Sequence, residues 1–420
     1  MLPLSRKSMA TEERLHRFFL SCSVTLSVAV CTLLIGVPTF ATAACSYSNL
    51  TELTLNNPGA NPGALKAYYF VPAKLPAGAP LVVVLHGCGQ RACDVDDELG
   101  WPYLAVKGNF ALLFPEEQPV GLLGASGDAL LGFKWWDDKL QIRGHREPAS
   151  IMNMIDEMIT RFSIDRNKVY ITGLSAGGAM TNLMLAEYPD RFAGGAPIAA
   201  VPYKCADGSK NVGLDECMGV PSPTLVERSG AYWGTLVRDA LCGPQPLGPL
   251  ILKGSAADCF SRKPSHQWPR VSIWQGANDN VVSPVNTDRI AKQWTNVHHL
   301  EATGVTEMVG TEPYVAKHVT YGDVGGKVQV ETWTIGQKSD PPPDWTKHMA
   351  PVYPAAQCGC VSVDCTCEKG GDCSAANHLT YIQDAHICSS ELILRFWGIG
   401  TSPTREMVSQ NAGASEGPRR

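Results

Sequence analysis

One short stretch, residues 169–192 (VYITGLSAGGAMTNLMLAEYPDRF), constrains the fold of this chain more than any other. An apolar run leads into GLSAG, residues 173–177, and a helical pattern follows and ends before Pro189. The pattern G-x-S-x-G is common by chance, but between a strand and a helix it is typical of the nucleophile elbow, a tight turn that exposes its serine. A serine that only caps an ordinary strand-to-helix turn is the plain alternative. The elbow predicts Ser175 as a nucleophile at a helix N-terminus, where the helix dipole favours developing negative charge.

The rest of the chain alternates apolar strands with helical segments. Strands are expected in LKAYYF, LVVVL, NKVYITG, RVSIWQG and KVQVETWTIG, and the apolar run NFALLFPEE is expected to end at Pro115. Helices are expected in PASIMNMIDEMITRF, with Pro148 in its first turn, and in SSELILRFWGI, with Ser389 or Ser390 as its cap. This order predicts an α/β fold, a mostly parallel sheet that helices cover on both faces.

The first 43 residues predict a secretory signal that is removed from the mature chain. An apolar stretch follows several basic side chains, and Ala41 and Ala43 form the small-x-small pattern that a signal peptidase recognises. An uncleaved membrane anchor is the alternative, because the apolar stretch is nearly long enough to span a bilayer. Lipidation of Cys45 is disfavoured, since Thr42 stands where an aliphatic residue is expected. Cleavage implies a secreted or periplasmic protein with no stable membrane insertion.

The mature chain is expected to form one catalytic domain, residues 44–400, and a polar, disordered tail, residues 401–420. Two segments interrupt the alternation of strands and helices. Residues 203–270 are expected to form a cysteine-containing insertion or cap, and residues 336–388 a cysteine-rich loop. The net charge is −5 and no run of lysine and arginine is long enough to follow phosphates, so nucleic-acid binding is not expected.

The cysteines predict disulfides, because an exported protein reaches an oxidising compartment. Of the 15 cysteines, Cys22 and Cys31 lie in the predicted signal, and the odd number that remains leaves one thiol, for which Cys45 is the natural position. A bridge between Cys88 and Cys93 depends on geometry, and the connectivity of the others stays open. Bridges are expected within two groups: Cys358, Cys360, Cys365, Cys367, Cys373 and Cys388, and Cys205, Cys217, Cys242 and Cys259.

A metal site is the competing interpretation of the first cysteine group. Its ligands would be Cys358, Cys360, Cys365, Cys367 and Cys373. Structural zinc usually shows C-x₂-C pairs, whereas these cysteines form C-x-C pairs, so no metal and no cofactor are expected.

A nucleophilic serine needs donors that stabilise an oxyanion, and an acid and a base. The donors are expected to be the backbone N–H groups of Ala176 and of Cys88, which lies in HGCG directly after the strand 81–85. His86 precedes the serine and is expected to shape this loop, because the base of such a site comes last in the chain. Asp279, after the strand RVSIWQG, is the expected acid, and an Asx turn is its plain alternative.

The sequence pattern alone does not decide which histidine is the base. His348 and His386 both lie in plausible loops after the strand KVQVETWTIG, and His378 lies between them. Chain order alone does not choose among them. Trp135 and Trp136 are expected either to form an aromatic wall for substrate or to pack in the core.

Several strings together resemble the poly(3-hydroxybutyrate) depolymerase family, which overlaps with feruloyl and acetylxylan esterases of the LpqC-like group. They are LVVVLHGCGQ, REPASI, VYITGLSAGGAM, VVSPVN and SSELILRFWGI, and the resemblance covers roughly residues 60–200 and 268–400. It implies an α/β-hydrolase with Ser175 as nucleophile and Asp279 as acid. It favours His348 as base, because KHMAP is similar to the family's GHxxP turn, with Lys347 in place of glycine. Where the family commonly has glycine, this chain has His386.

The resemblance implies a serine esterase that acts on small or polymeric esters, of the polyhydroxyalkanoate or the feruloyl and acetylxylan type. Residues 203–270 depart from the family pattern, so the substrate stays open. Glu147 is expected to be a charge at a helix N-terminus rather than a second acid. The alternative function is a non-catalytic, cysteine-rich binding protein on a hydrolase scaffold.

Overall fold

The computed structural model describes residues 47–96, 99–118, 132–137, 141–206, 212–219, 227–240, 268–300, 303–339, 341–352, 382–385 and 387–400. The predicted signal and tail, Cys45, His378 and His386 lie outside the described residues. So do Cys242, Cys259 and the five cysteines of residues 358–373. The boundaries expected for the catalytic domain therefore stay predictions.

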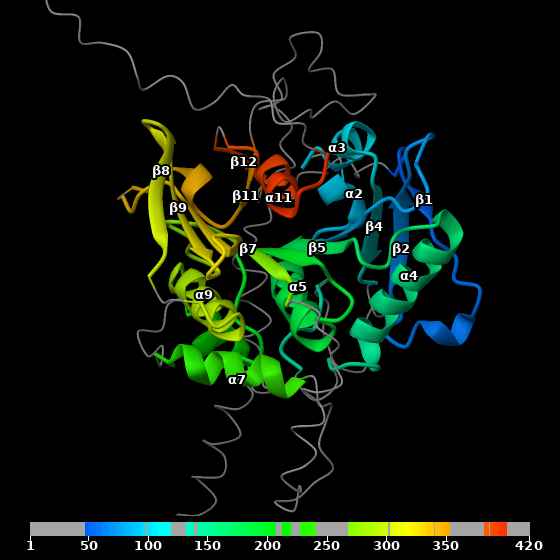
Figure 1. The fold of residues 1–420 in the computed structure, drawn as a ribbon, viewed down its shortest axis with the longest axis horizontal. Helices are drawn as coiled ribbons and strands as arrows, with labels where there is room; N and C mark the ends of the chain where they lie inside the picture. Colours follow the sequence, from blue (N-terminus) through cyan, green and yellow to red (C-terminus); the bar gives the residue numbers. More distant parts are fainter. Residues whose placement is uncertain are drawn as a thin grey trace, which may run out of the picture.

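A ten-stranded sheet, in the order β1-β2-β4-β3-β5-β6-β7-β10-β9-β8, forms the centre of the described part of the chain (Figure 1). The six strands from β4 to β10 in this order run parallel, and β2 and β9 flank them antiparallel. The strands are β1 (Thr51–Glu52), β2 (Lys66–Phe70), β3 (Leu81–Leu85), β4 (Ala111–Glu116), β5 (Val169–Leu174), β6 (Gly194–Ile198), β7 (Arg270–Gly276), β8 (Val305–Thr311), β9 (Tyr314–Gly322) and β10 (Val328–Ile335). A separate parallel pair consists of β11 (Ala350–Val352) and β12 (Ile382–Asp384).

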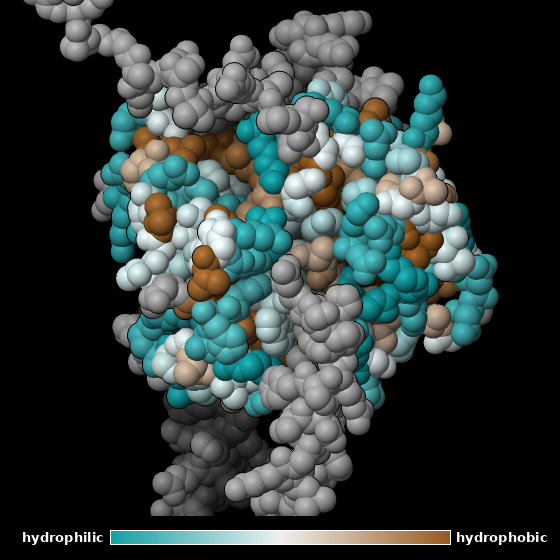
Figure 2. All heavy atoms as spheres, in the orientation of Figure 1, coloured by the Kyte–Doolittle hydropathy of each residue, from teal (hydrophilic) through white to brown (hydrophobic). Residues whose placement is uncertain are grey.

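Helices cover both faces of the sheet, as expected. They are α2 (Ala92–Asp96), α3 (Trp101–Gly108), α4 (Arg146–Phe162), α5 (Ala176–Glu187), α7 (Gly230–Ala240), α9 (Val285–Val297) and α11 (Ser389–Trp397), with short turns η1 (Pro58–Ala60), η2 (Gly213–Met218) and η3 (Asp344–Thr346). In Figure 1, α4, α5, α7 and α9 lie below the sheet and α2, α3 and α11 above it. Hydrophilic side chains cover much of α4, α7 and α9 on the face shown in Figure 2, because these helices bury their other side.

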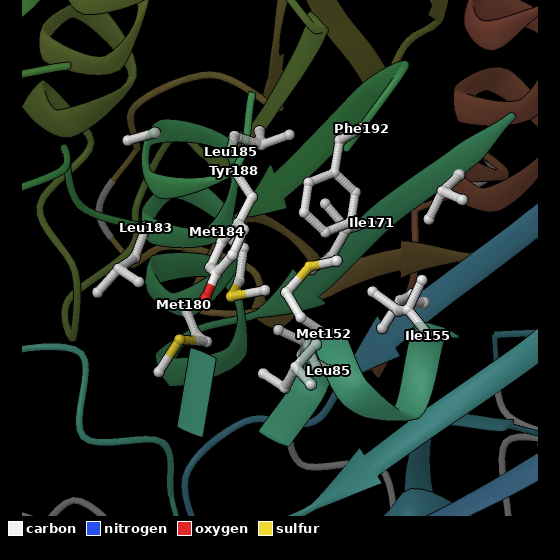
Figure 3. Packing of buried hydrophobic residues seen from close by; sticks show 14 of the residues in the cluster. Leu85, Met152, Ile155, Ile171, Met180, Leu183, Met184, Leu185, Tyr188 and Phe192 are labelled. Carbon is white, nitrogen blue, oxygen red and sulfur yellow. The ribbon is translucent and has the colours of Figure 1, made fainter. Parts of the chain in front are cut away.

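The two helical layers bury two separate apolar clusters. Strand β3 shows why: all five of its residues are buried, and successive side chains point to opposite faces. Leu81, Val83 and Leu85 belong to the cluster under α4, α5, α7 and α9, whereas Val82 and Val84 belong to the cluster under α2, α3 and α11. Figure 3 shows the first cluster, where methionines of α4 and α5 pack beside Leu85 and Ile171. Both faces of the sheet are therefore packed. This packing holds the central strands, and with them the loops at their ends, in defined positions.

Two local predictions were wrong. Pro115 does not end the apolar run but lies inside β4, opposite Ala67 of β2, beyond the last β3–β4 pair at Val83 and Leu113. A proline is tolerated there because no β3 partner requires its missing N–H. Neither serine at the start of α11 caps it: Ser389 donates to Pro351 O and Ser390 to Leu99 O, both at 2.7 Å.

Candidate active site

Ser175 lies between β5 and α5 in a conformation that residues other than glycine rarely adopt. Its φ is 56° and its ψ is −116°, and its side chain makes no capping hydrogen bond to α5. Positive φ in a residue with a side chain costs free energy and is concentrated at functional sites. The backbone N–H of Ser175 donates to Ile198 O of the neighbouring strand β6 at 2.9 Å. The plain capping alternative therefore does not describe this serine, whereas the elbow geometry does.

The glycines around Ser175 are required by close backbone contacts. A Cβ on Gly177 would lie 2.3 Å from Leu85 O and 2.5 Å from His86 O. A Cβ on Gly173 would lie 2.7 Å from Leu85 O. Real Cβ atoms do not approach so closely, so the end of β3 leaves no room for any side chain at these two positions. The G-x-S-x-G pattern thus reflects how tightly the elbow packs against the neighbouring strand.

Asp279 and His348 contact each other, although 69 residues separate them. His348 Nδ1 lies 2.7 Å from Asp279 Oδ2, and only 4% of Asp279 and 6% of His348 is exposed. The other carboxylate oxygen, Oδ1, accepts the backbone N–H groups of Val281 and Val282, both at 2.8 Å. Asp279 therefore makes an Asx-type turn with one oxygen and holds the imidazole with the other, so the two interpretations of this residue are compatible. A proton on Nδ1 leaves Nε2 as the basic nitrogen.

The loop that carries His348 is fixed to the turn that carries Asp279. Asn278 donates its backbone N–H to Thr346 O at 2.8 Å, and a Cβ on Gly276 would lie 2.1 Å from Lys347 O. Lys347, which stands where the resembling family has glycine, has φ −91° and ψ −150°, an extended conformation that any residue adopts. The lysine therefore introduces no backbone strain beside the histidine.

The sheet brings Ser175 to the same end as this pair. Ser175 follows the last residue of β5, Asp279 follows β7, and His348 lies in the loop after β10. The strands β5, β6, β7 and β10 are parallel neighbours, so their carboxyl ends meet at one edge of the sheet. This edge is where open α/β sheets place their ligands.

The loop after β3 contains His86, whose ring is fully buried. Its Nδ1 donates to Gly87 O at 2.8 Å and its Nε2 accepts the backbone N–H of Glu117 at 3.0 Å. Burial lowers the pKa of His86, which favours the neutral ring. Both nitrogens are occupied, which supports the expectation that His86 shapes the loop and is not the base. The oxyanion roles of Cys88 and Ala176 stay predictions.

The cysteines differ in part from the expectation. Cys205 and Cys217 form a disulfide within the insertion between β6 and β7, as predicted for this group. Cys93 is also disulfide-bonded, but Cys88 retains its thiol, so the bridge considered between these two does not form. Cys88 carries its thiol in the loop of the predicted oxyanion donor, and the expectation for Cys45, which lies outside the described residues, stays a prediction. Cys388 is disulfide-bonded, and the bridges expected within its group stay predictions, because the other five cysteines of that group lie outside the described residues.

Trp135 and Trp136 belong to a small apolar cluster apart from the two core clusters. Their rings meet edge to face at 5.9 Å, and both are half-buried. The cluster reaches Ala179, one turn of α5 after Ser175, and Val282 in the Asp279 turn. It also contains Cys217 of the disulfide. The tryptophans therefore lie beside the site rather than in the main core.

Sequence reasoning missed a buried charge cluster beside these tryptophans. Glu147, 2% exposed, accepts the backbone N–H of Lys134 at 3.0 Å, and Lys134 Nζ lies 2.6 Å from Glu117 Oε1 and 3.3 Å from Glu147 Oε1. Burial and the neighbouring Glu117 carboxylate raise the pKa of Glu147 well above its ordinary value. Glu147 is in the first turn of α4, as expected, but its carboxylate is buried and forms an ion pair with Lys134. Two adjacent acidic residues after an apolar strand, Glu116 and Glu117, were the available signal.

Within the described residues, no group of three or more histidine, cysteine or acidic side chains is placed to hold a metal ion. The five cysteines considered as metal ligands lie outside them. None of the described helices is both long and apolar enough to cross a membrane.

Comparison with known proteins identifies the family. A model of the family "Esterase PHB depolymerase" matches residues 65–210. Poly(3-hydroxyalkanoate) depolymerase C of Paucimonas lemoignei is 36% identical over 361 residues, which cover 85% of this chain and 72% of the relative. The chain belongs to the PHB depolymerase family of esterases. As a member of this family it is a carboxylic ester hydrolase.

Other relatives of this PHB depolymerase-family esterase carry different names. Feruloyl esterase B of Talaromyces funiculosus is 28% identical over 282 residues, 67% of this chain and 70% of that protein. The structure of an acetyl xylan esterase from Aspergillus awamori matches 74% of this chain and 99% of its own, with a TM-score of 0.54 and 21% identity. This last similarity shows the fold alone, and it confirms the α/β-hydrolase fold that the sequence resemblance implied.

Proposed function

We propose that this esterase cleaves its substrate through an acyl-enzyme formed on Ser175, with His348 as the base and Asp279 as the acid that orients it. The observation that supports it most strongly is the buried 2.7 Å contact between His348 Nδ1 and Asp279 Oδ2, at the sheet edge that also carries the strained Ser175. A histidine whose Nδ1 is held by a carboxylate has Nε2 as its basic nitrogen and can act as a general base.

The chemistry follows from these roles. His348 Nε2 takes the proton of the Ser175 hydroxyl while the oxygen attacks the ester carbonyl. The carbonyl oxygen becomes an oxyanion, which the backbone N–H groups of Ala176 and Cys88 stabilise. His348 returns the proton to the leaving alcohol as the carbon–oxygen bond breaks. Water, activated by the same nitrogen, then hydrolyses the acyl-enzyme and releases the carboxylic acid.

The apolar cluster around Trp135 and Trp136 is assigned to the substrate. It lies between α5 and the Asp279 turn, and its half-buried rings form an aromatic wall beside Ser175. Such a wall suits esters with an apolar or aromatic portion. This agrees with both ester classes that the relatives' names print, a poly(3-hydroxyalkanoate) and a feruloyl ester. A panel of p-nitrophenyl esters of rising chain length, methyl ferulate and polyhydroxybutyrate films separates the two classes.

Export of the protein is part of the proposal. The predicted signal at residues 1–43 supports it, and so do the disulfide between Cys205 and Cys217 and the bonded state of Cys93 and Cys388. Disulfides persist in oxidising compartments and are rare in the cytosol. The test is the N-terminal sequence of the protein recovered outside the cytoplasm, which is expected to begin directly after Ala43 or Ala44.

Ser175→Ala tests the mechanism. Ester hydrolysis is expected to fall by about 10⁴-fold or more. The free energy of unfolding should change by no more than about 1 kcal/mol, since only one hydroxyl is lost. An organophosphonate is expected to label Ser175, and Ser229→Ala, at an exposed serine, serves as the control that keeps full activity and labelling. Hydrolysis at the wild-type rate in Ser175→Ala would contradict the proposal.

A further inference from the structure

A cavity lies at the opposite end of the central strands from Ser175. Its volume is about 370 Å³, and it is lined at the amino ends of three parallel strands by Tyr170 of β5, Ala193 before β6 and Arg270 of β7. Ser175 follows the carboxyl end of β5, so five residues, or about 17 Å of extended chain, separate it from Tyr170. The cavity is therefore separate from the site described above.

Aromatic side chains form a smaller part of the wall of this cavity. The rings of Tyr170 and Trp397 stack with centroids 4.9 Å apart and an interplanar angle of 26°, and both residues, like Phe192, are largely buried. Trp268 is half-buried and also lines the cavity. Its ring offers apolar contact area to a small ligand.

The rim of the cavity carries an excess of positive charge. Four cationic side chains line it, and Asp190 is the one carboxylate among its lining residues. Asp190 is already neutralised, because both of its oxygens accept from Arg143, at 2.6 and 2.8 Å. Asp156, which does not line the cavity, forms ion pairs with two of the four cations, Arg166 and Arg191. The four are Arg166, Arg191, Arg270 and Lys327.

Arg270 forms no ion pair within the described residues. Its guanidinium is half-buried over the ring of Phe396, at 4.1 Å from the centroid, with Nε donating to Val328 O at 2.9 Å and Nη1 to Phe396 O. Burial lowers the pKa of Arg270, although the nearby carboxylate of Glu331 acts to raise it. Carbonyl oxygens satisfy hydrogen bonds but do not neutralise a charge, and a partly desolvated charge without an ion pair is costly. An anion in the cavity would offset this cost.

We propose that this cavity is a second binding site, for a small organic carboxylate with an apolar or aromatic body. The guanidinium of Arg270, together with Arg166 and Lys327, would receive the carboxylate, and the half-buried ring of Trp268 would contact the body. Arginine suits this role because its planar donors match a carboxylate. The volume corresponds to the small end of ligand pockets, which limits the ligand to one or two units of a hydroxy acid. Ester hydrolysis releases carboxylates of this class, so products of the enzyme itself fit the description.

The experiment measures binding rather than catalysis, so its outcome does not depend on the role of Ser175. Ferulate, 3-hydroxybutyrate, inorganic phosphate and the neutral coniferyl alcohol are titrated into the full-length protein by calorimetry. The variants are Lys327→Ala, Arg166→Ala and their combination, since both side chains are exposed and Lys327 forms no ion pair within the described residues. Lys317→Ala, at an exposed lysine on β9 of the same sheet, is the matched control.

Ferulate or 3-hydroxybutyrate is expected to bind the wild type, with affinity that falls as salt is raised. Each single variant should weaken binding by about threefold and the double variant by about tenfold. Lys317→Ala should leave it unchanged, and hydrolysis of p-nitrophenyl acetate should be equal in all variants. Absence of carboxylate binding, or equal binding in the double variant, would overturn the proposal, the latter because the acid then occupies only the catalytic site. Phosphate binding as tightly as the organic acids would overturn the assignment of Trp268 to the body of the ligand.

Discussion

The proposed nucleophile and the proposed base of this esterase are held in place by different means. Ser175 is fixed by backbone: the glycines beside it pack against carbonyl oxygens of β3, and every residue of the following helix α5 is buried. His348 is fixed by a side-chain bond to Asp279 and by the contact of its loop with the turn after β7. The loop itself leads from η3 into the short strand β11, outside the ten-stranded sheet.

This difference indicates which quantities a mutation changes at each place. At the glycines beside Ser175, position and stability depend on the same contacts, so a change at either glycine should alter the free energy of unfolding and the activity together. At His348, a single side-chain contact orients the imidazole, so a change there should lower kcat far more than it lowers stability. The following predictions test this contrast.

The largest expected effect concerns the base. His348→Ala should lower kcat by about 10⁴-fold or more, because the nucleophile then has no proton acceptor. The free energy of unfolding should fall by only about 1–3 kcal/mol, because the buried carboxylate of Asp279 loses one of its hydrogen-bond partners. His386→Ala, measured beside it, should keep most of the activity. An inactive His386→Ala with an active His348→Ala would show that the resemblance assigned the wrong histidine.

Gly177→Ala tests the other side of the contrast. The added methyl group would lie 2.3 Å from Leu85 O, so β3 and the elbow must separate. We expect a loss of about 3 kcal/mol in the free energy of unfolding, at the upper end for overpacked positions, together with loss of hydrolysis. Gly322→Ala is the control, because its Cβ would have no neighbour nearer than 3.6 Å. A stable but inactive Gly177→Ala would break the link between stability and activity at the elbow.

Loss of the Cys205–Cys217 disulfide is expected to affect both stability and catalysis, each to an intermediate extent. The segment around Cys217 holds the Asp279 turn: Met218 O accepts the backbone N–H of Ser283 at 2.7 Å, and Cys217 O accepts from Asn286 Nδ2 at 2.8 Å. Replacing both cysteines by alanine should cost about 2–4 kcal/mol and should also lower kcat/KM. Reductant should reproduce the loss, whereas a chelator should have no effect.

Thiol counting on the denatured, unreduced protein completes this test. About one thiol is expected, because one cysteine of an odd number remains when the others pair. Several thiols accompanied by stoichiometric zinc would instead favour the metal site considered for the cysteine-rich loop.

The smallest expected effect, on the pH dependence of stability, concerns His318. Its contacts with two glutamates offer a second histidine–carboxylate interaction to compare with that of His348 and Asp279. Burial acts to lower the pKa of His318, but hydrogen bonds to Glu331 and Glu307 outweigh burial and raise it above the ordinary value. A raised pKa in the folded state means that the stabilisation is complete below the unfolded pKa and is lost as pH rises through the folded pKa. Because Glu307 is 65% exposed and its charge is screened by solvent, we expect about 1 kcal/mol at most.

The measurement compares His318→Gln with the wild type by urea unfolding between pH 5.5 and pH 9. The difference in unfolding free energy should shrink as pH rises, and kcat should stay equal. A change in kcat would show that this distant pair influences the site.

Much of this architecture follows from local sequence signals. The elbow was predictable because G-x-S-x-G, the apolar run and the helical pattern all lie within 24 residues, 169–192. The contact of Asp279 with His348 needed the fold, since only the order of β7 and β10 in the sheet brings the two loops together. The assignment of His348 came from the resemblance rather than from the residues themselves.

The features that were missed depend on long-range contacts or weak patterns. The hairpin of β8 and β9 escaped because β8 is almost entirely exposed and shows no apolar alternation. Lys134 forms ion pairs with Glu117, 17 positions away, and with Glu147, 13 positions away. Neither the period of a helix nor that of a strand predicts contacts at such separations. Ser389 and Ser390 resembled helix caps, but carbonyl oxygens of other segments were better placed to accept from them.

The proposed aromatic wall belongs to peripheral segments and not to the strands that hold the elbow. A Cβ on Gly213 would lie 3.2 Å from Trp135 and 3.3 Å from Trp136, so this glycine packs directly against both tryptophans. Cys217 and Met218 of the same segment contact the Asp279 turn and are needed there, whereas Gly213 makes no such contact among the hydrogen bonds of the described residues. A substitution at Gly213 is therefore the natural starting point for altering which esters the enzyme accepts, because it would displace the tryptophans and leave the elbow glycines in place.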